Sequence, residues 1–143
     1  ICNGFQVLCE SGLLPGALRK NVGLKFLCKW VELEVVNTHT PFTSRAEPGH
    51  LLRIPINHFE GSWYCDPETY EEMEGNGQIV LRYCDNPNGS LERVAGICNE
   101  RGNVFGLMPH PERACEGLLG SIDGTIIFGS IIDHVTQNRA IPA

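Results

Sequence analysis

Hydrophobic and polar residues recur along this chain with two spacings, one typical of helices and the other typical of strands. In residues 3–11 the apolar side chains follow helical spacing and Gly12 stands where a helix would end, so we predict a short helix there. In residues 30–36 apolar side chains alternate with two glutamates. That alternation predicts a strand with one face toward solvent.

Short apolar segments predict four more strands. Two of them lie at residues 51–56 and 78–83. The other two, at residues 94–98 and 104–108, flank a polar loop that contains a glycine, which is typical of a hairpin. The last of these strands leads directly to His110.

Two further helices complete the pattern. Asp66 followed by Pro67 is a helix-start signal, and we expect that helix to end near Gly75. Residues 123–135 carry an apolar stripe with helical spacing and predict a longer helix. Strands interleaved with helices favour an α/β fold, here with an antiparallel strand element in the middle of the chain.

The composition is that of one ordinary globular domain. The chain has 143 residues, of which 42% are hydrophobic and 20% charged, and a formal net charge of −6. Because binding to a phosphate backbone requires clustered lysines and arginines, we expect no nucleic-acid partner. No apolar run approaches the ~20 residues that cross a bilayer and no secretory signal is recognisable, so we expect a cytoplasmic protein without membrane contact.

The seven cysteines argue against a disulfide framework, because their number is odd. No two of them form a Cys-x-x-Cys pair, so the sequence predicts reduced thiols and no metal site. The first residue is Ile1, and no strand precedes the cysteine at position 2. We therefore expect these residues to be a fragment of a longer chain.

Three residues supply the groups that nucleophilic acyl transfer requires. Cys2 stands just before the predicted first helix, where backbone amides and the helix dipole favour a thiolate. His110 lies between two prolines at a strand end, and Glu112 is close enough to orient it. The alternatives are a buried inert cysteine and a structural turn.

Residues 58–61 (HFEG) form a third polar cluster, after the strand predicted at 51–56. Its histidine and carboxylate make it a candidate second acid/base site, or a site of contact with substrate or partner through His58 and Glu60. The alternative is a surface turn.

Four segments resemble those of a known enzyme family. They are CNGFQ at 2–6, GLLPGA at 12–17, HFEG at 58–61 and MPHPERA at 108–114. In this order they resemble the glutaminase subunits of phosphoribosylformylglycinamidine synthase, which are class I, triad-type glutamine amidotransferases. The resemblance implies a flavodoxin-like α/β fold whose first strands, N-terminal to the nucleophile, are missing here, so that residues 1–143 would be a partial domain.

The resemblance also implies roles for individual residues. Cys2 would attack the carboxamide of glutamine to give a thioester and ammonia, with His110 moving protons and Glu112 orienting it. The amide of Asn3 would help to hold the oxyanion, which the position at a helix start supports independently. Gln6 would contact the glutamine substrate.

The partners implied by the resemblance are glutamine, a larger synthetase subunit and a small accessory subunit. Ammonia would pass to the synthetase subunit, which uses ATP and Mg²⁺ to make formylglycinamidine ribonucleotide in purine biosynthesis. We expect no cofactor in this chain itself. Two alternatives stay open: another cysteine γ-glutamyl hydrolase on the same fold, and a truncated non-catalytic subunit that keeps only the synthetase-binding surface.

Overall fold

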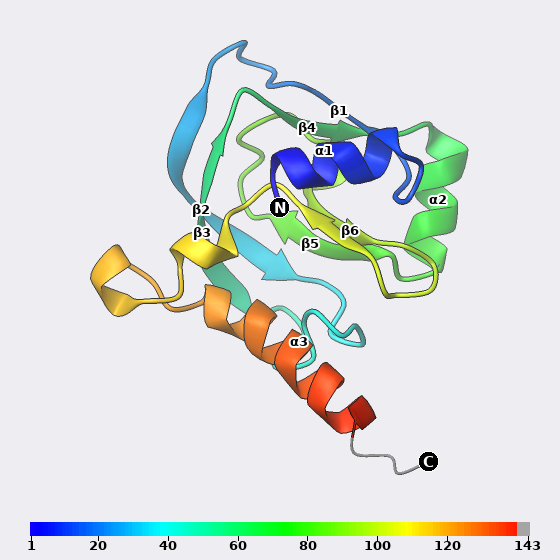
Figure 1. The fold of residues 1–143 in the computed structure, drawn as a ribbon. Helices are drawn as coiled ribbons and strands as arrows, with labels where there is room; N and C mark the ends of the chain where they lie inside the picture. The colour runs from blue at the N-terminus through cyan, green and yellow to red at the C-terminus, as the bar shows by residue number, and fades with distance from the viewer. Residues whose placement is uncertain (140–143) are drawn as a thin grey trace.

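The computed structural model describes residues 1–139, which form strands with helices at both ends and in the middle of the chain (Figure 1). The elements, including three short 3-10 helices (η), are α1 (Asn3–Glu10), β1 (Ala17–Lys20), β2 (Leu27–Val35), β3 (Leu51–His58), β4 (Glu60–Tyr64), α2 (Pro67–Gly75), β5 (Ile79–Tyr83), η1 (Leu91–Arg93), β6 (Val94–Cys98), β7 (Phe105–Leu107), η2 (Pro111–Arg113), η3 (Gly117–Leu119) and α3 (Gly124–Arg139).

The strands form two antiparallel sheets. Five strands pair in the order β3-β2-β5-β6-β7, and β1 pairs with β4 in a separate two-stranded sheet. The strands and helices expected from the sequence are all present, with ends that differ by a few residues. The antiparallel element expected in the middle extends through the whole larger sheet, and β1 and β4 are additions that the sequence pattern did not predict.

Helices cover both faces of the larger sheet. Buried apolar side chains form two clusters, and the neighbouring residues Ile97 and Cys98 of β6 belong to different ones. Because successive side chains of a strand point to opposite faces, the two clusters lie on opposite sides of the sheet. Ile127 of α3 packs in one and Phe5 of α1 in the other, as the positions of these helices in Figure 1 illustrate.

A glycine in β7 determines how closely α1 approaches the sheet. A side-chain carbon at Gly106 would collide with the ring of Phe5 and with Leu14. Phe5 is 0% exposed, so glycine at this position lets the first turn of α1 lie directly on β7. Cys2 lies just before that turn, and the chain leaves β7 toward His110. The contact between α1 and β7 therefore brings Cys2 and His110 toward each other.

A side-chain cap marks the start of α2, and a contact with β3 marks the start of α3. The carboxylate of Asp66 accepts from the amide of Thr69 at 3.0 Å, and Pro67 follows at the first helical position, as expected for α2. The carboxylate of Asp123 accepts from the amide of Arg53 at 2.7 Å, which ties the start of α3 to β3. Within residues 1–139, no helix combines the length and apolar character needed to cross a membrane.

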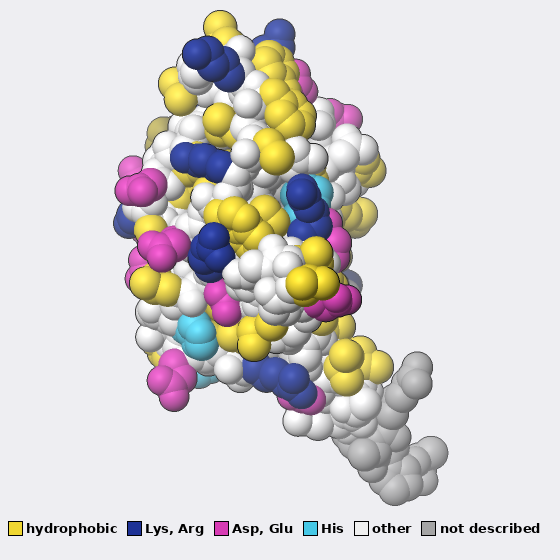
Figure 2. All heavy atoms as spheres, turned by 90° about the vertical axis from the view of Figure 1, so that its left-hand side faces the viewer, with side chains coloured by type: hydrophobic (Ala, Val, Ile, Leu, Met, Phe, Trp, Pro, Cys, Tyr) yellow, Lys and Arg dark blue, Asp and Glu magenta, His cyan; other side chains and the backbone are white. Residues whose placement is uncertain are grey.

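The face that carries β2, β3 and η3 mixes apolar and charged side chains (Figure 2). Leu118 in η3 is 96% exposed, and Leu119 and Ile122 beside it are more than half exposed. These residues follow η2 directly in the chain, so an apolar surface lies close in sequence to His110 and Glu112.

Candidate active site

Cys2 occupies a strained turn at the start of α1. It is the residue that caps the helix, and its φ of 52° and ψ of −113° lie in a region that residues other than glycine rarely adopt. Its amide donates to the carbonyl of Leu107 at the end of β7, at 2.8 Å. The tie to β7 and the packing of Phe5 therefore hold the cysteine in this conformation.

The segment that carries His110 is held by two strands of the larger sheet, β6 and β3. The chain leaves β7 at Leu107, and the amide of Met108 donates to Ala95 of β6 at 3.1 Å. The amide of His110 itself donates to the carbonyl of Pro55 in β3 at 2.8 Å. The backbone of His110 is thus fixed by the sheet, in agreement with the strand-end position predicted from the sequence.

Glu112 orients the imidazole from η2. Its Oε1 lies 2.6 Å from Nδ1 of His110, and the two side chains are 45% and 16% exposed respectively. Because a carboxylate accepts, Nδ1 carries a proton and Nε2 is left for proton exchange. Nε2 is buried and has no hydrogen-bond partner of standard geometry among the described residues.

The acid–base properties of Cys2 and His110 depend on one another. Side-chain hydrogen bonding with His110 is the main reason why the pKa of the Cys2 thiol is lowered, against the effect of burial; the amide of Asn3 lowers it further. The pKa of His110 is raised, first by Cys2 and then by Glu112, again against burial. Thiolate and imidazolium therefore favour each other, which is the state that a nucleophilic cysteine needs.

Two further candidates lie on α1. Asn3 follows Cys2 directly, is exposed, and its amide faces the thiol side of the turn. Gln6 is half-buried one turn later, and its Nε2 donates to Glu10 Oε1 at 3.1 Å. Contact of Gln6 with substrate stays a prediction.

His58 is buried rather than placed on a surface turn. It ends β3, is 4% exposed, and Nδ1 lies 3.1 Å from Oδ1 of Asn21. Burial, with a smaller contribution from the charge of His110, lowers its pKa to about 4. Glu60 begins β4 opposite Lys20 and is half-buried. Contact of His58 and Glu60 with substrate stays a prediction.

Two residues that lie around this site were not predicted from the sequence. The carbonyl of Asn57 lies 3.7 Å from Sγ of Cys2, within reach of the thiol proton. Asn21, in the loop after β1, contacts His58 across 37 positions of sequence. Neither asparagine lies in a motif or a periodic segment, so only the pairing of distant strands brings them to the site.

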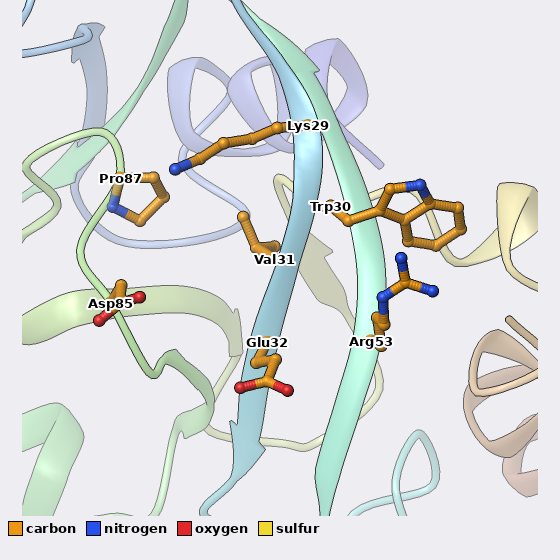
Figure 3. Close-up of a pocket in the computed structure, with 7 residues that line it drawn as sticks. All are labelled: Lys29, Trp30, Val31, Glu32, Arg53, Asp85 and Pro87. Carbon is orange, nitrogen blue, oxygen red and sulfur yellow. The ribbon is translucent and has the colours of Figure 1, made fainter. Parts of the chain in front are cut away.

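Two hollows lie along β2 and β3, and one of them borders the site. One is lined by Cys28, Lys29, Trp30, Pro55, Glu112, Arg113 and Leu119, so it borders the carboxylate that orients His110. The other shares Lys29 and Trp30 with the first, and in it the guanidinium of Arg53 lies 4.5 Å from the centre of the Trp30 ring (Figure 3). Within residues 1–139 no group of three or more histidines, cysteines and carboxylates is arranged to hold a metal ion.

Comparisons with known proteins agree with this geometry. Residues 1–125 match the model of a family described as the CobB/CobQ-like glutamine amidotransferase domain. A chain in the structure of PurLQS from Thermotoga maritima is 51% identical, with a TM-score of 0.84 over 93% of the present chain. The present chain spans 59% of the length of that chain. The resemblance found in the four motifs, and the fold that it implies, are thereby confirmed.

Proposed function

This chain belongs to the family of CobB/CobQ-like glutamine amidotransferase domains, and on that premise we propose that it hydrolyses glutamine to glutamate and ammonia. The observation that carries the proposal is the convergence of Cys2 with the His110–Glu112 pair, whose Nδ1 and Oε1 are 2.6 Å apart. These residues come from two ends of the chain, and the pKa of the thiol is lowered chiefly by the imidazole. A buried inert cysteine would have a raised pKa.

In the first step, the thiolate of Cys2 attacks the side-chain carbonyl carbon of glutamine. The carbon–nitrogen bond then breaks while the imidazolium of His110 donates a proton to the leaving nitrogen, giving ammonia and a γ-glutamyl thioester. The carboxylate of Glu112 stabilises the imidazolium that is present before this transfer. The amide of Asn3, which already favours the thiolate, is available to the oxygen that becomes negative during attack.

In the second step, water attacks the thioester. His110, now neutral, accepts a proton from the water, and the carbon–sulfur bond breaks to release glutamate and regenerate the thiolate. The same imidazole thus acts first as an acid and then as a base. Its half-buried position beside Cys2, with Nδ1 held by Glu112 and Nε2 left for proton exchange, suits both transfers.

We further propose that the ammonia passes to a synthetase subunit that makes formylglycinamidine ribonucleotide in purine biosynthesis, in a cytoplasmic complex that also contains a small accessory subunit. The 51% identity with a chain of the PurLQS structure supports this assignment. ATP and Mg²⁺ would act on the synthetase subunit. The exposed apolar side chains of η3, close to His110 in sequence, are a suitable surface for such a partner.

The proposal is tested by labelling with an electrophilic glutamine analogue, followed by peptide mass spectrometry. We expect the label on Cys2 alone among seven cysteines, suppressed by excess glutamine. Turnover is measured as ammonia release from the chain assembled with its synthetase partner. Cys2→Ala should abolish labelling and turnover without preventing assembly. Cys84→Ala removes a half-buried thiol just after β5, beside charged groups outside the triad, and should change neither.

Three results would contradict the proposal. Association with the synthetase without turnover would favour a non-catalytic subunit. Faster release from another γ-glutamyl compound than from glutamine would favour a different cysteine hydrolase on the same fold. Unchanged turnover in Cys2→Ala would exclude the nucleophile.

A further inference from the structure

One end of β3 contacts both catalytic groups through its backbone. The carbonyl of Pro55 accepts from the amide of His110 at 2.8 Å, and the carbonyl of Asn57 lies 3.7 Å from Sγ of Cys2. These carbonyls are two residues apart on the same strand. A shift of this strand end would therefore move the imidazole and the thiol relative to each other.

Strand pairing in the larger sheet holds this end of β3 from one side only, up to its last residue. β3 is the edge strand of the larger sheet, so β2 is its one neighbour in that sheet. His58, the last residue of β3, is opposite Leu27, the first residue of β2. The ladder of backbone hydrogen bonds stops at this pair, and anything that fixes the chain beyond it must come from elsewhere.

Asn21 supplies that support. The backbone amide of Asn21 donates to the carbonyl of Phe59 at 2.9 Å. Its side-chain Nδ2 donates to the carbonyls of His58 and Lys25, also at 2.9 Å. Asn21 is 1% exposed, so these bonds are shielded from water. One side chain therefore connects the loop after β1, the approach to β2 and the end of β3.

The remaining oxygen of Asn21 fixes the ring of His58. Because Nδ2 donates to carbonyls, Oδ1 faces His58 Nδ1 at 3.1 Å as an acceptor, and the imidazole carries its proton on Nδ1. On its other side the ring lies against Gly61, where a side-chain carbon would collide with it. The ring is thus enclosed between β4 and the asparagine.

We propose that Asn21 is a positioning residue for the reaction: by fixing the end of β3, it sets how the Cys2 thiol and the His110 imidazole face each other. It does not touch the substrate and acts through the carbonyls of Pro55 and Asn57. This inference rests on the proposed function for its catalytic meaning. It predicts that loss of the Asn21 side chain weakens the thiol–imidazole interaction while the rest of the fold persists.

The test measures alkylation of Cys2 by iodoacetamide as a function of pH, by peptide mass spectrometry on the full chain. In Asn21→Ala we expect the rate at pH 7 to fall about tenfold, since small displacements of catalytic groups cost large factors in rate. The pH midpoint of alkylation should rise toward that of an ordinary thiol, and the His110 amide should exchange with deuterium faster. Asn21→Asp keeps the side-chain volume and the oxygen that faces His58 Nδ1, but it loses the Nδ2 donor to the carbonyl of His58. Its alkylation rate and midpoint should change in the same direction as in Asn21→Ala.

The matched control is Asn37→Ala. The side chain of Asn37 also bridges two loops, through the carbonyl of Gly77 and the backbone amide of His39. Asn37 follows the C-terminal end of β2, whereas Asn21 lies near its N-terminal end at Leu27. Its variant should keep the alkylation rate and midpoint of the original chain. Folding of each variant is verified by circular dichroism at the assay temperature.

Two results would overturn the inference. One is a folded Asn21 variant whose alkylation rate, midpoint and His110 exchange match those of the original chain. The other is an equal loss in Asn37→Ala, which would indicate a general effect of destabilisation. The iodoacetamide assay measures the reactivity of the Cys2 thiol and needs no glutamine. Absence of glutaminase turnover would therefore contradict the proposed function without deciding whether Asn21 positions the thiol and the imidazole.

Discussion

The two histidines near Cys2 have opposite acid–base properties. His110 is half-buried, its Nδ1 faces the carboxylate of Glu112, and its pKa is raised, most strongly by Cys2. His58 is buried, its Nδ1 faces the amide oxygen of Asn21, and burial lowers its pKa to about 4. The partner of the ring and its access to water, rather than the residue type, therefore decide which histidine becomes positively charged near neutral pH.

In the proposed mechanism, an uncharged His58 favours protonation of His110. A positive charge on His58 would oppose protonation of His110, since the two rings interact electrostatically. A neutral amide partner and a dry environment keep His58 uncharged at neutral pH, so His110 can form the imidazolium that pairs with the Cys2 thiolate.

The largest effect should come from removing the proton carrier. His110→Asn eliminates the group that lowers the pKa of Cys2 and that, in the proposed mechanism, protonates the leaving nitrogen. We expect turnover to fall by about 10³-fold or more, as for other members of catalytic triads. Ammonia release in the assembled complex measures turnover, and alkylation measured against pH should show a raised midpoint for Cys2. A variant with near-normal turnover would show that another group moves the protons.

The next effect concerns the other histidine and appears as acid sensitivity of the fold. The folded pKa of His58 is about 4 and its ordinary value is 6.5, so between these pH values the unfolded chain binds more protons than the folded one. The free energy of unfolding should thus decrease as pH falls from 6.5 toward 4, by up to about 3 kcal/mol from this residue.

His58→Gln tests that expectation, because glutamine does not titrate. Urea unfolding at several pH values should give a flatter acid dependence for this variant than for the original chain. The contribution of His110 to the free energy of unfolding changes with pH in the opposite direction. Because its pKa is raised in the folded state, it stabilises the fold below the ordinary value of 6.5, and this contribution is lost as pH rises through the folded pKa. Equal acid slopes in the two proteins would mean that His58 is not the buried neutral group.

A smaller effect is expected from the orienting carboxylate. Glu112→Gln keeps a hydrogen-bond acceptor for Nδ1 but removes the charge that raises the pKa of His110. We expect kcat to fall roughly 10- to 100-fold with little change in KM, because the charge acts on proton transfer rather than on glutamine binding. Glu116→Gln removes an exposed carboxylate four residues away and should have no such effect. A large rise in KM for Glu112→Gln alone would assign the carboxylate to binding.

The contrast between the histidines also explains how far the sequence could be interpreted. Cys2, His110 and Glu112 lie in short motifs beside strongly patterned elements, so their local setting was predictable: a helix start for the cysteine and a strand end for the histidine. The alternation in β2 and the cap of α2 predicted those elements for the same local reason.

The setting of His58 was not predictable, because it depends on long-range contacts. β1 and β4 are short and lack a clear alternation of apolar and polar residues, and they become strands by pairing with each other across about forty positions. The burial of His58 and the contact with Asn21 follow from that pairing. The surface turn, which was the alternative interpretation of the cluster at residues 58–61, does not describe His58, which is buried where β3 meets β4.

The smallest effect should come from an ion pair as short as that of the active site but remote from it in sequence. Arg45 Nε lies 2.6 Å from Asp133 Oδ2, and a second bond of 2.7 Å makes the pair bidentate, yet both side chains are well exposed. Solvent screens such a pair, so Arg45→Gln should leave turnover and Cys2 labelling unchanged and lower the urea midpoint only slightly. Arg45→Gln is assayed together with Glu112→Gln. If both variants lost turnover equally, the carboxylate of Glu112 would matter for general stability. Loss in Glu112→Gln alone would assign its effect to the orientation and charge of His110.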